Sequence, residues 1–308
     1  MRKALKEQEP ILKDWAQKLV EKCSESANAH QPVDMVRYWN FTTFDIIADL
    51  TFGEGLGMLT SGEYHAWVTT IFANLKFAAR LAAIKTLHPI LRTFVRDFVE
   101  HTEVAERRRQ AHFNFSVQRL DQHLTRKVER PDFWTRILSR DDTQDAFSMD
   151  EQYETASLFM VAGTETSASA LSGTTYYLLR NPRCLDKLAT ELRTTFRSFE
   201  DLSLTQLARC QYLQACIQEG LRVYPPLPIM PPRRTPPGGC VIDGWWVAGN
   251  TKVDINQYAA HHDEEAFHRA HEYIPERWLS DKSDEFKNDR LDSVEPFNIG
   301  PRNCLGQV

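Results

Sequence analysis

Hydrophobic side chains recur at helical spacing through the first 140 residues of the chain. The first stripe consists of Ile11, Leu12, Trp15, Leu19 and Val20. Pro10 precedes this stripe and is expected in the first turn of its helix, where the missing N–H has no intrahelical partner to lose. A second stripe covers residues 33–50, a glycine-rich break follows at 51–57, and the pattern returns over 64–99 and, with more charge, over 100–130. The first half of the chain is therefore predicted to be almost wholly helical.

The next predicted helix is the longest one. Ser148 and Glu151 form a capping box at its start, and Asn181-Pro182 stops it after Arg180. At the standard rise such a helix is about 48 Å long and crosses the full width of a domain. Its apolar middle is interrupted by Ala162-Gly163-Thr164-Glu165-Thr166. A glycine, an acid and two hydroxyls inside an apolar helix make this segment a candidate for chemistry.

The last third of the chain changes character. Helices are predicted over residues 182–199 and 204–224, and a proline pair ends the second. Residues 240–256 are rich in β-branched and aromatic types and contain Asp243-Gly244, a pattern typical of β-hairpins. The expected fold is a single domain over residues 1–308, mainly α, with a long central helix and a small β part in its C-terminal third.

Composition narrows the class of protein. Hydrophobic residues make up 42% of the 308, which is enough for a sizeable core, and the net charge of −5 argues against nucleic acid as the main partner. The six cysteines are irregularly spaced and form no C-x-x-C, so free thiols are expected rather than disulfides or a zinc ribbon. The start is charged and no apolar stretch reaches the length that crosses a bilayer. The chain as written is therefore expected to be soluble and cytoplasmic.

The strongest chemical signal lies near the end of the chain, in the pattern F-x-x-G-x-R-x-C-x-G. Its fixed positions are Phe297, Gly300, Arg302, Cys304 and Gly306. A cysteine that ligates haem iron needs neighbours that stabilise negative charge on its sulfur. Arg302 can meet a haem carboxylate with its planar guanidinium, and Gly306 lets the backbone approach a flat ring. The alternative is that Cys304 is an ordinary buried thiol in a surface loop.

Two further clusters each have a structural and a chemical interpretation. Glu165 and Thr166 are either a proton-active pair or, through back-bonding of the Thr166 hydroxyl to the preceding turn, only a kink in the helix. Glu219 and Arg222 share a helix face. They are either an exposed ion pair worth under about 1 kcal/mol or part of a buried cluster that Arg277 completes.

Four histidines form a third cluster, near several acids: His261, His262, His268 and His271. Metal binding is conceivable, but no H-E-x-x-H or C-x-x-C motif supports it. Solvated surface histidines are the expected interpretation.

These motifs, in this order, resemble those of the cytochrome P-450 family of haem-thiolate monooxygenases, over residues 162–306. The resemblance implies a partial P-450 fold in which Cys304 is the axial ligand of the haem iron. It also implies that Glu165 and Thr166 relay protons to iron-bound dioxygen. Glu219, Arg222 and Arg277 would form a buried structural cluster beneath the cysteine loop. The other residues assigned to haem binding are Phe297, Gly300, Arg302, Gly306, Ala162, Gly163 and Arg233, with Arg234 as the alternative to Arg233.

The function that this resemblance implies is hydroxylation of an apolar small molecule with O2. Electrons would come from NADPH through a cytochrome P-450 reductase. The apolar substrate is inferred from the helix segment expected to face the pocket, which contains Phe159, Met160, Ala162 and Gly163. Residues 64–115 would supply a lid. Upstream stretches resemble hydroxylases of fungal secondary metabolism, of the isotrichodermin C-15 hydroxylase type, and family members of this kind sit at the endoplasmic reticulum membrane.

The chain also departs from the family pattern. It lacks the anchor helix and β-sheet region that would precede Met1, a W-x-x-x-R motif, and the helix that would follow the haem cysteine. A domain truncated at both ends is therefore expected. One alternative is therefore a non-catalytic remnant with weak or no haem binding. The second alternative is a haem-thiolate isomerase or lyase that uses no external electrons. The Glu165-Thr166 pair argues against this alternative.

Overall fold

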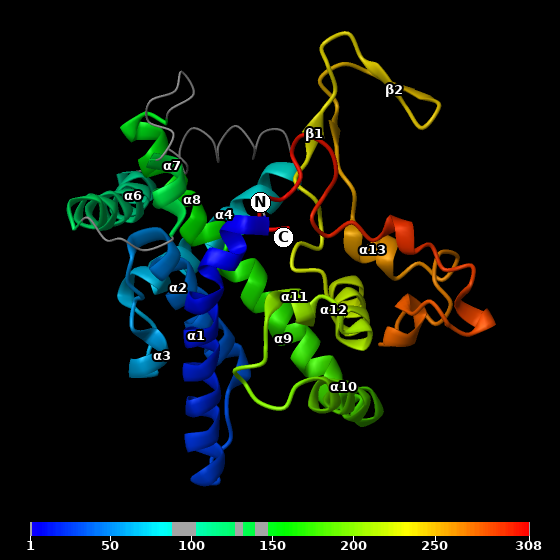
Figure 1. Cartoon of the computed structure of the whole chain (residues 1–308). Helices are drawn as coiled ribbons and strands as arrows, with labels where there is room; N and C mark the ends of the chain where they lie inside the picture. Colours follow the sequence, from blue (N-terminus) through cyan, green and yellow to red (C-terminus); the bar gives the residue numbers. More distant parts are fainter. Residues whose placement is uncertain (1, 88–102, 127–131, 139–146, 308) are drawn as a thin grey trace. The chain divides into compact units, whose positions relative to one another are not determined.

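The computed structural model describes residues 2–87, 103–126, 132–138 and 147–307 of the chain (Figure 1). It divides into two compact units, Met1–Ala168 and Ser169–Val308, which are described separately below. Within the described ranges, no helix combines the length and the apolar character that spanning a membrane requires.

The regular elements of the first unit's described residues are all helices. They are α1 (Arg2–Asn28), α2 (Met35–Phe52), α3 (Met58–Ser61), α4 (Ala66–Leu87), α6 (Glu103–Thr125), α7 (Phe133–Leu138), α8 (Met149–Ala162) and the first turn of α9 (Glu165–Arg180). The expected helical first half is confirmed over these ranges, while residues 88–102 of the predicted lid lie outside the described residues. The placement of Pro10 in a first turn was wrong, because α1 starts eight residues earlier. A proline ring is compatible with helical φ, so the helix continues through it and loses one backbone hydrogen bond.

Helix α2 lies at the centre of this unit and packs against α1, α3, α6, α7 and α8. The core around it contains Phe41, Phe44, Leu120, Trp134 and Met160, all 1% exposed or less. Gly53 ends α2 with φ 75°, and a Cβ there would lie 2.6 Å from Nδ1 of His123. The glycine-rich break predicted at 51–57 is therefore required by both backbone conformation and packing.

The long helix is interrupted. The capping box at Ser148 and Glu151 is confirmed, but α8 ends at Ala162 and α9 begins at Glu165. At the break, the hydroxyl of Thr164 donates to the carbonyl of Met160 (2.8 Å) and that of Thr166 donates to the carbonyl of Ala162 (2.7 Å). These hydroxyls compete with backbone N–H groups for the same carbonyls, which is why the predicted continuous helix is two helices.

The second unit contains the rest of α9, with α10 (Pro182–Thr195), α11 (Leu204–Leu207), α12 (Gln211–Val223) and α13 (Gln257–His261). Three 3-10 turns follow: η2 (Pro275–Trp278), η3 (Asp284–Phe286) and η4 (Leu291–Ser293). The helix predicted over 204–224 is divided into α11 and α12. Glu191 on α10 explains the division, because its carboxylate accepts the N–H groups of Tyr212 and Leu213 (both 2.9 Å) and so caps a new helix start.

The β part is small, as expected. Strand β2 (Cys240–Ile242) pairs antiparallel with β3 (Trp245–Val247) across a turn at Asp243-Gly244, whose φ angles are 48° and 78°. Positive φ at both turn residues is typical of the tight hairpin turn that Asp-Gly favours. Strand β1 (Arg233–Arg234) pairs with β4 (Lys252–Val253) at the base of the hairpin. The predicted mainly α fold with a hairpin in residues 240–256 is confirmed.

Candidate functional site

The carboxylate of Glu219 is the centre of a buried charge cluster in the second unit. Oε1 accepts from Nη2 of Arg222 (2.8 Å), Nε of Arg277 (3.0 Å) and the backbone N–H of Ile274 (2.9 Å). Oε2 accepts from Nε of Arg222 (2.9 Å) and from the indole of Trp278 (2.9 Å). The three charged side chains are 0% exposed. The interpretation of Glu219 and Arg222 as an exposed ion pair is therefore wrong.

The remaining donors of the two arginines are also satisfied. Arg222 donates to the carbonyls of His261, Ala270 and Glu272, at 2.7 to 2.9 Å. Arg277 donates to the carboxylate of Asp289 and to the carbonyl of His268. Burial acts to raise the pKa of Glu219, but the two guanidinium groups outweigh it and hold that pKa below its ordinary value. Because every partner is present, the cluster ties α12 to the 261–289 segment instead of destabilising the fold.

The histidine cluster does not match its prediction at one position. His261 is 0% exposed and not a solvated surface residue, because α13 places its ring against the carbonyl of Arg222, 3.2 Å from Nδ1. Burial lowers the pKa of His261 to about 4. His268 and His271 are exposed, as predicted. Within the described ranges, no group of three or more His, Cys, Asp or Glu side chains is arranged to hold a metal ion.

Cys304 lies in a tight loop near the end of the second unit. Its backbone N–H donates to the carbonyl of Phe297 (2.7 Å), and the N–H of Gly306 donates to its sulfur (3.3 Å). Gly300 turns the loop with φ 83°. Cys304 is exposed, so the alternative of an ordinary buried thiol is wrong. The loop therefore presents an accessible sulfur that accepts one backbone N–H.

The other residues assigned to this site lie in different surroundings. Arg302 is exposed in the same loop, and Phe297 is half-buried at its start. Arg233 is exposed in β1, opposite Val253, and Arg234 donates to the carbonyl of Asn250 (3.2 Å). No described side chain holds Arg302 or Arg233 in an ion pair, so both guanidinium groups are available to a carboxylate ligand.

In the first unit, Glu165 and Thr166 stand at the start of α9. Glu165 is half-buried, and its Oε2 has no hydrogen-bond partner among the described residues. Burial raises the pKa of Glu165 above its ordinary value, and the charge of Lys76 opposes this rise. The Thr166 hydroxyl back-bonds to Ala162, so the kinked-helix interpretation describes the resting geometry. A hydroxyl that donates one hydrogen bond still has lone pairs with which to accept another.

The face that α8 exposes differs from the prediction. Met160 is 0% exposed and belongs to the core of the first unit, whereas Leu158 is 59% exposed and Ala162 is also exposed. Gly163 lies against α2, and a Cβ there would be 2.8 Å from Cδ1 of Ile47. Helical periodicity explains the error, because residues 158 and 162 share a face that residue 160 does not. The exposed face next to Glu165 is still apolar.

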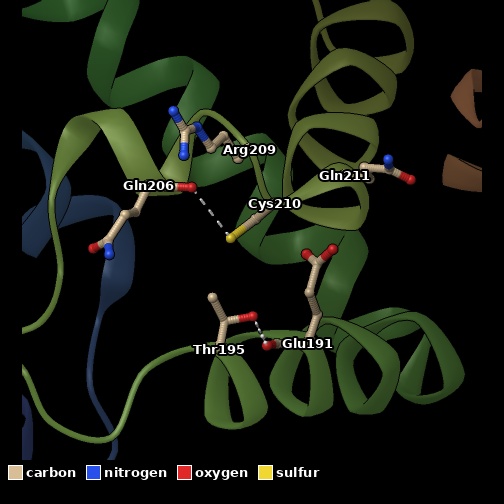
Figure 2. A pocket seen from close by; sticks show the side chains of 6 residues that line it. All are labelled: Glu191, Thr195, Gln206, Arg209, Cys210 and Gln211. Carbon is tan, nitrogen blue, oxygen red and sulfur yellow. Dashed lines mark hydrogen bonds between the residues drawn. The ribbon is translucent and has the colours of Figure 1, made fainter.

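The structure contains a polar hollow that the sequence did not predict. It lies where α10 meets the start of α12 (Figure 2). Its volume is about 280 Å³, and its lining includes Glu191, Arg209 and Cys210. Glu191 already caps α12, and the Cys210 thiol points at the carbonyl of Gln206, 3.6 Å away. The hollow is thus explained by the packing of these helices.

The mainly helical fold carries three features together: a loop with an accessible cysteine, a buried cluster of one glutamate and two arginines, and a helix break that contains an acid and a threonine. Together they define a haem-thiolate type of protein. The chain belongs to the cytochrome P-450 family, whose model matches residues 1–308. A crystal structure of a cytochrome P-450 matches the fold with a TM-score of 0.79, at 20% identity, and covers 100% of this chain and 68% of that one. Cytochromes P-450 carry haem on a cysteine thiolate, so the predicted family and its cofactor are confirmed.

The similar curated proteins are fungal. Cytochrome P-450 monooxygenase efuB from Hormonema carpetanum is 43% identical over 99% of this chain and 60% of its own length. Trichothecene C-15 hydroxylase from Fusarium sporotrichioides is 38% identical over 98% of this chain and 61% of its own. Trichothecene C-4 hydroxylase from Trichoderma arundinaceum is 38% identical over 99% and 62%. The resemblance to fungal secondary-metabolism hydroxylases is confirmed, and the chain spans about 60% of the length of these relatives.

Proposed function

We propose that this chain is the haem-binding part of a monooxygenase that hydroxylates an apolar small molecule. O2 is the oxidant, and NADPH supplies electrons through a cytochrome P-450 reductase. The observation that carries the proposal is the exposed sulfur of Cys304 with the Gly306 N–H directed at it, within a loop that matches the family pattern. The relatives named as hydroxylases support the reaction class. We include in the proposal a location at the endoplasmic reticulum and a single domain over residues 1–308.

The residues of the cysteine loop fit a haem group. Cys304 would supply a thiolate ligand, and Gly306 lies beside its sulfur, where an added Cβ would only be in ordinary van der Waals contact, 3.5 Å away. Arg302 and Arg233 are free guanidinium groups for the haem carboxylates. The cluster around Glu219 holds the 261–289 segment and so positions the chain that leads into the loop. When bound, thiolate-ligated haem supplies the electron density that favours cleavage of the O–O bond.

The chain's own residues handle protons and substrate. The raised pKa of Glu165 means that its carboxyl holds a proton more readily than an exposed glutamate, and its unpartnered Oε2 can pass that proton on. The Thr166 hydroxyl, fixed by its bond to Ala162, can accept it. Leu158 and Ala162 give the neighbouring α8 face an apolar surface that excludes water and favours an apolar substrate.

Haem reconstitution tests the proposal. The purified chain should take up haem and show the red-shifted Soret band of a thiolate-ligated, reduced carbon monoxide complex. Cys304→Ser should lose this band, while Cys240→Ser, which removes another thiol that is not buried, should keep it. An unchanged band in Cys304→Ser would place the ligand elsewhere, and absence of haem uptake would establish the non-catalytic remnant. Product formation with and without NADPH and reductase then separates a monooxygenase from an isomerase or lyase.

A further inference from the structure

Two histidines meet just after α13, in the cluster that has no part in the haem chemistry. His262 directly follows α13, and His271 lies nine residues further along the chain. Their ring centroids are 5.3 Å apart with 37° between the ring planes, so the rings are neighbours but are not stacked in parallel. Two imidazoles at this separation are either a simple ring contact or the two protein ligands of a metal ion.

The hydrogen bond of the His262 ring selects the nitrogen that can bind a metal. Nδ1 of His262 lies 2.8 Å from the carbonyl oxygen of Tyr258. A carbonyl oxygen only accepts, so Nδ1 carries the hydrogen, and Nε2 of the neutral ring keeps a lone pair. The ring of Tyr258 stacks on that of His262, with 4.2 Å between centroids, and holds its plane. Metal-binding histidines are commonly oriented by such an Nδ1–H bond to a backbone carbonyl.

The separation of the two rings fits tetrahedral coordination. Zinc lies about 2.1 Å from an imidazole nitrogen and therefore about 3.2 Å from the ring centroid. Two rings that share one zinc at the tetrahedral angle have centroids about 5.2 Å apart, against about 4.5 Å at the right angle of a square-planar site. The observed 5.3 Å matches the tetrahedral value. The His271 side chain is 65% exposed, so its ring can turn Nε2 toward that of His262 without disturbing the core.

The charges around the pair favour a cation. Oε1 of Glu264 lies 4.0 Å from Nε2 of His271, within reach of a water molecule bound to the same metal. The residues on both sides of Glu264 in the sequence are also exposed acids. The buried cation Arg222, whose charge reaches His262, already forms an ion pair with Glu219. The local balance of charge is therefore negative on the exposed side of the pair.

We propose that His262 and His271 form a zinc site of two imidazole nitrogens. Within the described ranges no group of three or more His, Cys, Asp or Glu side chains is arranged for a metal, so water completes the tetrahedral shell. The metal joins the end of α13 to residues 270–272, two of whose carbonyls accept from Arg222. Bound zinc therefore stabilises this segment in its folded form. The site lies outside the proposed function and needs neither haem nor turnover.

Zinc titration of the complete 308-residue chain tests the inference. After metals are removed with EDTA and the chelator is dialysed away, calorimetry with zinc chloride should show saturable binding. His262→Gln and His271→Gln should each weaken this binding at least about tenfold, equivalent to about 1.4 kcal/mol. His268→Gln is the matched control, because this histidine of the same cluster is 52% exposed and its ring contacts Glu285 and Phe286 instead. It should change the affinity less than about twofold.

The exposed thiol of Cys304 is a competing zinc ligand, and two measurements separate it from the histidine pair. Binding should survive Cys304→Ser. X-ray absorption of the zinc complex should show only nitrogen and oxygen neighbours, two of them imidazoles at about 2.1 Å. Sulfur in the coordination shell, or binding that is lost in Cys304→Ser, would place the metal at the cysteine loop and overturn the inference.

Unfolding gives a readout of the link between the two segments. Zinc should raise the urea midpoint of the wild type and leave that of His271→Gln unchanged. His271→Gln suits this comparison because the exposed position lets the variant keep its packing. No saturable binding below about 1 mM zinc, or equal affinity of the wild type and both glutamine variants of the pair, would overturn the inference. So would a loss of affinity in His268→Gln as large as that in His271→Gln.

Discussion

Glu219 and Arg277 meet in the interior of the second unit although 58 residues separate them in sequence. Nε of Arg277 donates to Oε1 of Glu219 over 3.0 Å, and both side chains are 0% exposed. Removing either residue alone takes one charged partner away from the other, which stays buried with Arg222 (for Glu219) or Asp289 (for Arg277) as its remaining charged partner. The segment after α12 is therefore expected to fold stably only when both Glu219 and Arg277 are present.

Arg277→Leu should lower the free energy of unfolding by about 3–5 kcal/mol, because the buried Asp289 carboxylate loses its guanidinium partner and the Glu219 carboxylate loses one of its two. Urea unfolding followed by circular dichroism measures the change. Arg183→Leu is the matched control, since Arg183 is 77% exposed and lies 3.5 Å from Glu276. It should cost less than about 1 kcal/mol. Similar losses in the two variants would show that the buried cluster contributes little.

His261 should make stability depend on pH below neutrality. Its pKa in the folded chain is about 4, against an ordinary value of 6.5, so the unfolded chain binds the extra proton first. The contribution of neutral His261 to the free energy of unfolding is fully present above pH 6.5. It decreases as the pH falls from 6.5 to 4, and the total loss is about 3 kcal/mol.

Unfolding titrations of wild type and His261→Asn across this range measure the effect. Asparagine keeps a donor for the Arg222 carbonyl and does not titrate, so the variant should lose stability less steeply between pH 6.5 and 4. His271→Asn, at a position where the side chain is 65% exposed, should follow wild type. Parallel curves for wild type and His261→Asn would contradict the assignment.

The sequence predicted what periodicity and local motifs determine. The mainly α fold, the capping box at Ser148 and the Asp243-Gly244 hairpin all depend on residues within a few positions of one another. Tertiary partners determine what was missed. The predicted 204–224 helix is divided by Glu191, which lies on the neighbouring helix α10. Nothing within residues 204–224 indicates this division.

The candidate site shows the same division. The family pattern identified Glu219, Arg222 and Arg277, and the structure brings them together. The family pattern did not indicate that His261 is buried, because a run of histidines and acids has the composition of a surface. The only feature of the sequence that could have indicated it is the spacing of apolar residues around His261. Likewise, Met160 was expected to face a pocket because apolar type alone does not distinguish the two sides of α8.

Gly220, between Glu219 and Arg222, should tolerate no side chain. A Cβ there would lie 2.2 Å from Oγ1 of Thr174 on α9, so Gly220→Ala should cost about 1–3 kcal/mol of unfolding free energy. Thr174→Ala removes the obstructing atoms and should recover part of the loss in a double-mutant cycle. Gly238→Ala, at a position with open space around it, should change stability by less than about 0.5 kcal/mol. Additive effects of the Gly220 and Thr174 substitutions would mean that the two residues do not limit each other.

Thr166→Ala should separate electron consumption from hydroxylation, if the proposed function holds. Alanine removes the hydroxyl that donates to the Ala162 carbonyl over 2.7 Å and that, in the proposed function, accepts the proton held by Glu165. NADPH oxidation by the reductase-coupled enzyme should continue while product falls about tenfold or more, and hydrogen peroxide should account for the difference. Thr166→Ser keeps a hydroxyl and should retain most of the coupling. Thr164→Ala removes the other hydroxyl at the break, which is buried and bonded to Met160, and should leave the coupling close to wild type. Product and peroxide yields per NADPH that stay at wild-type values in Thr166→Ala would remove Thr166 from proton delivery. Its bond to Ala162 would then be only the cause of the helix break.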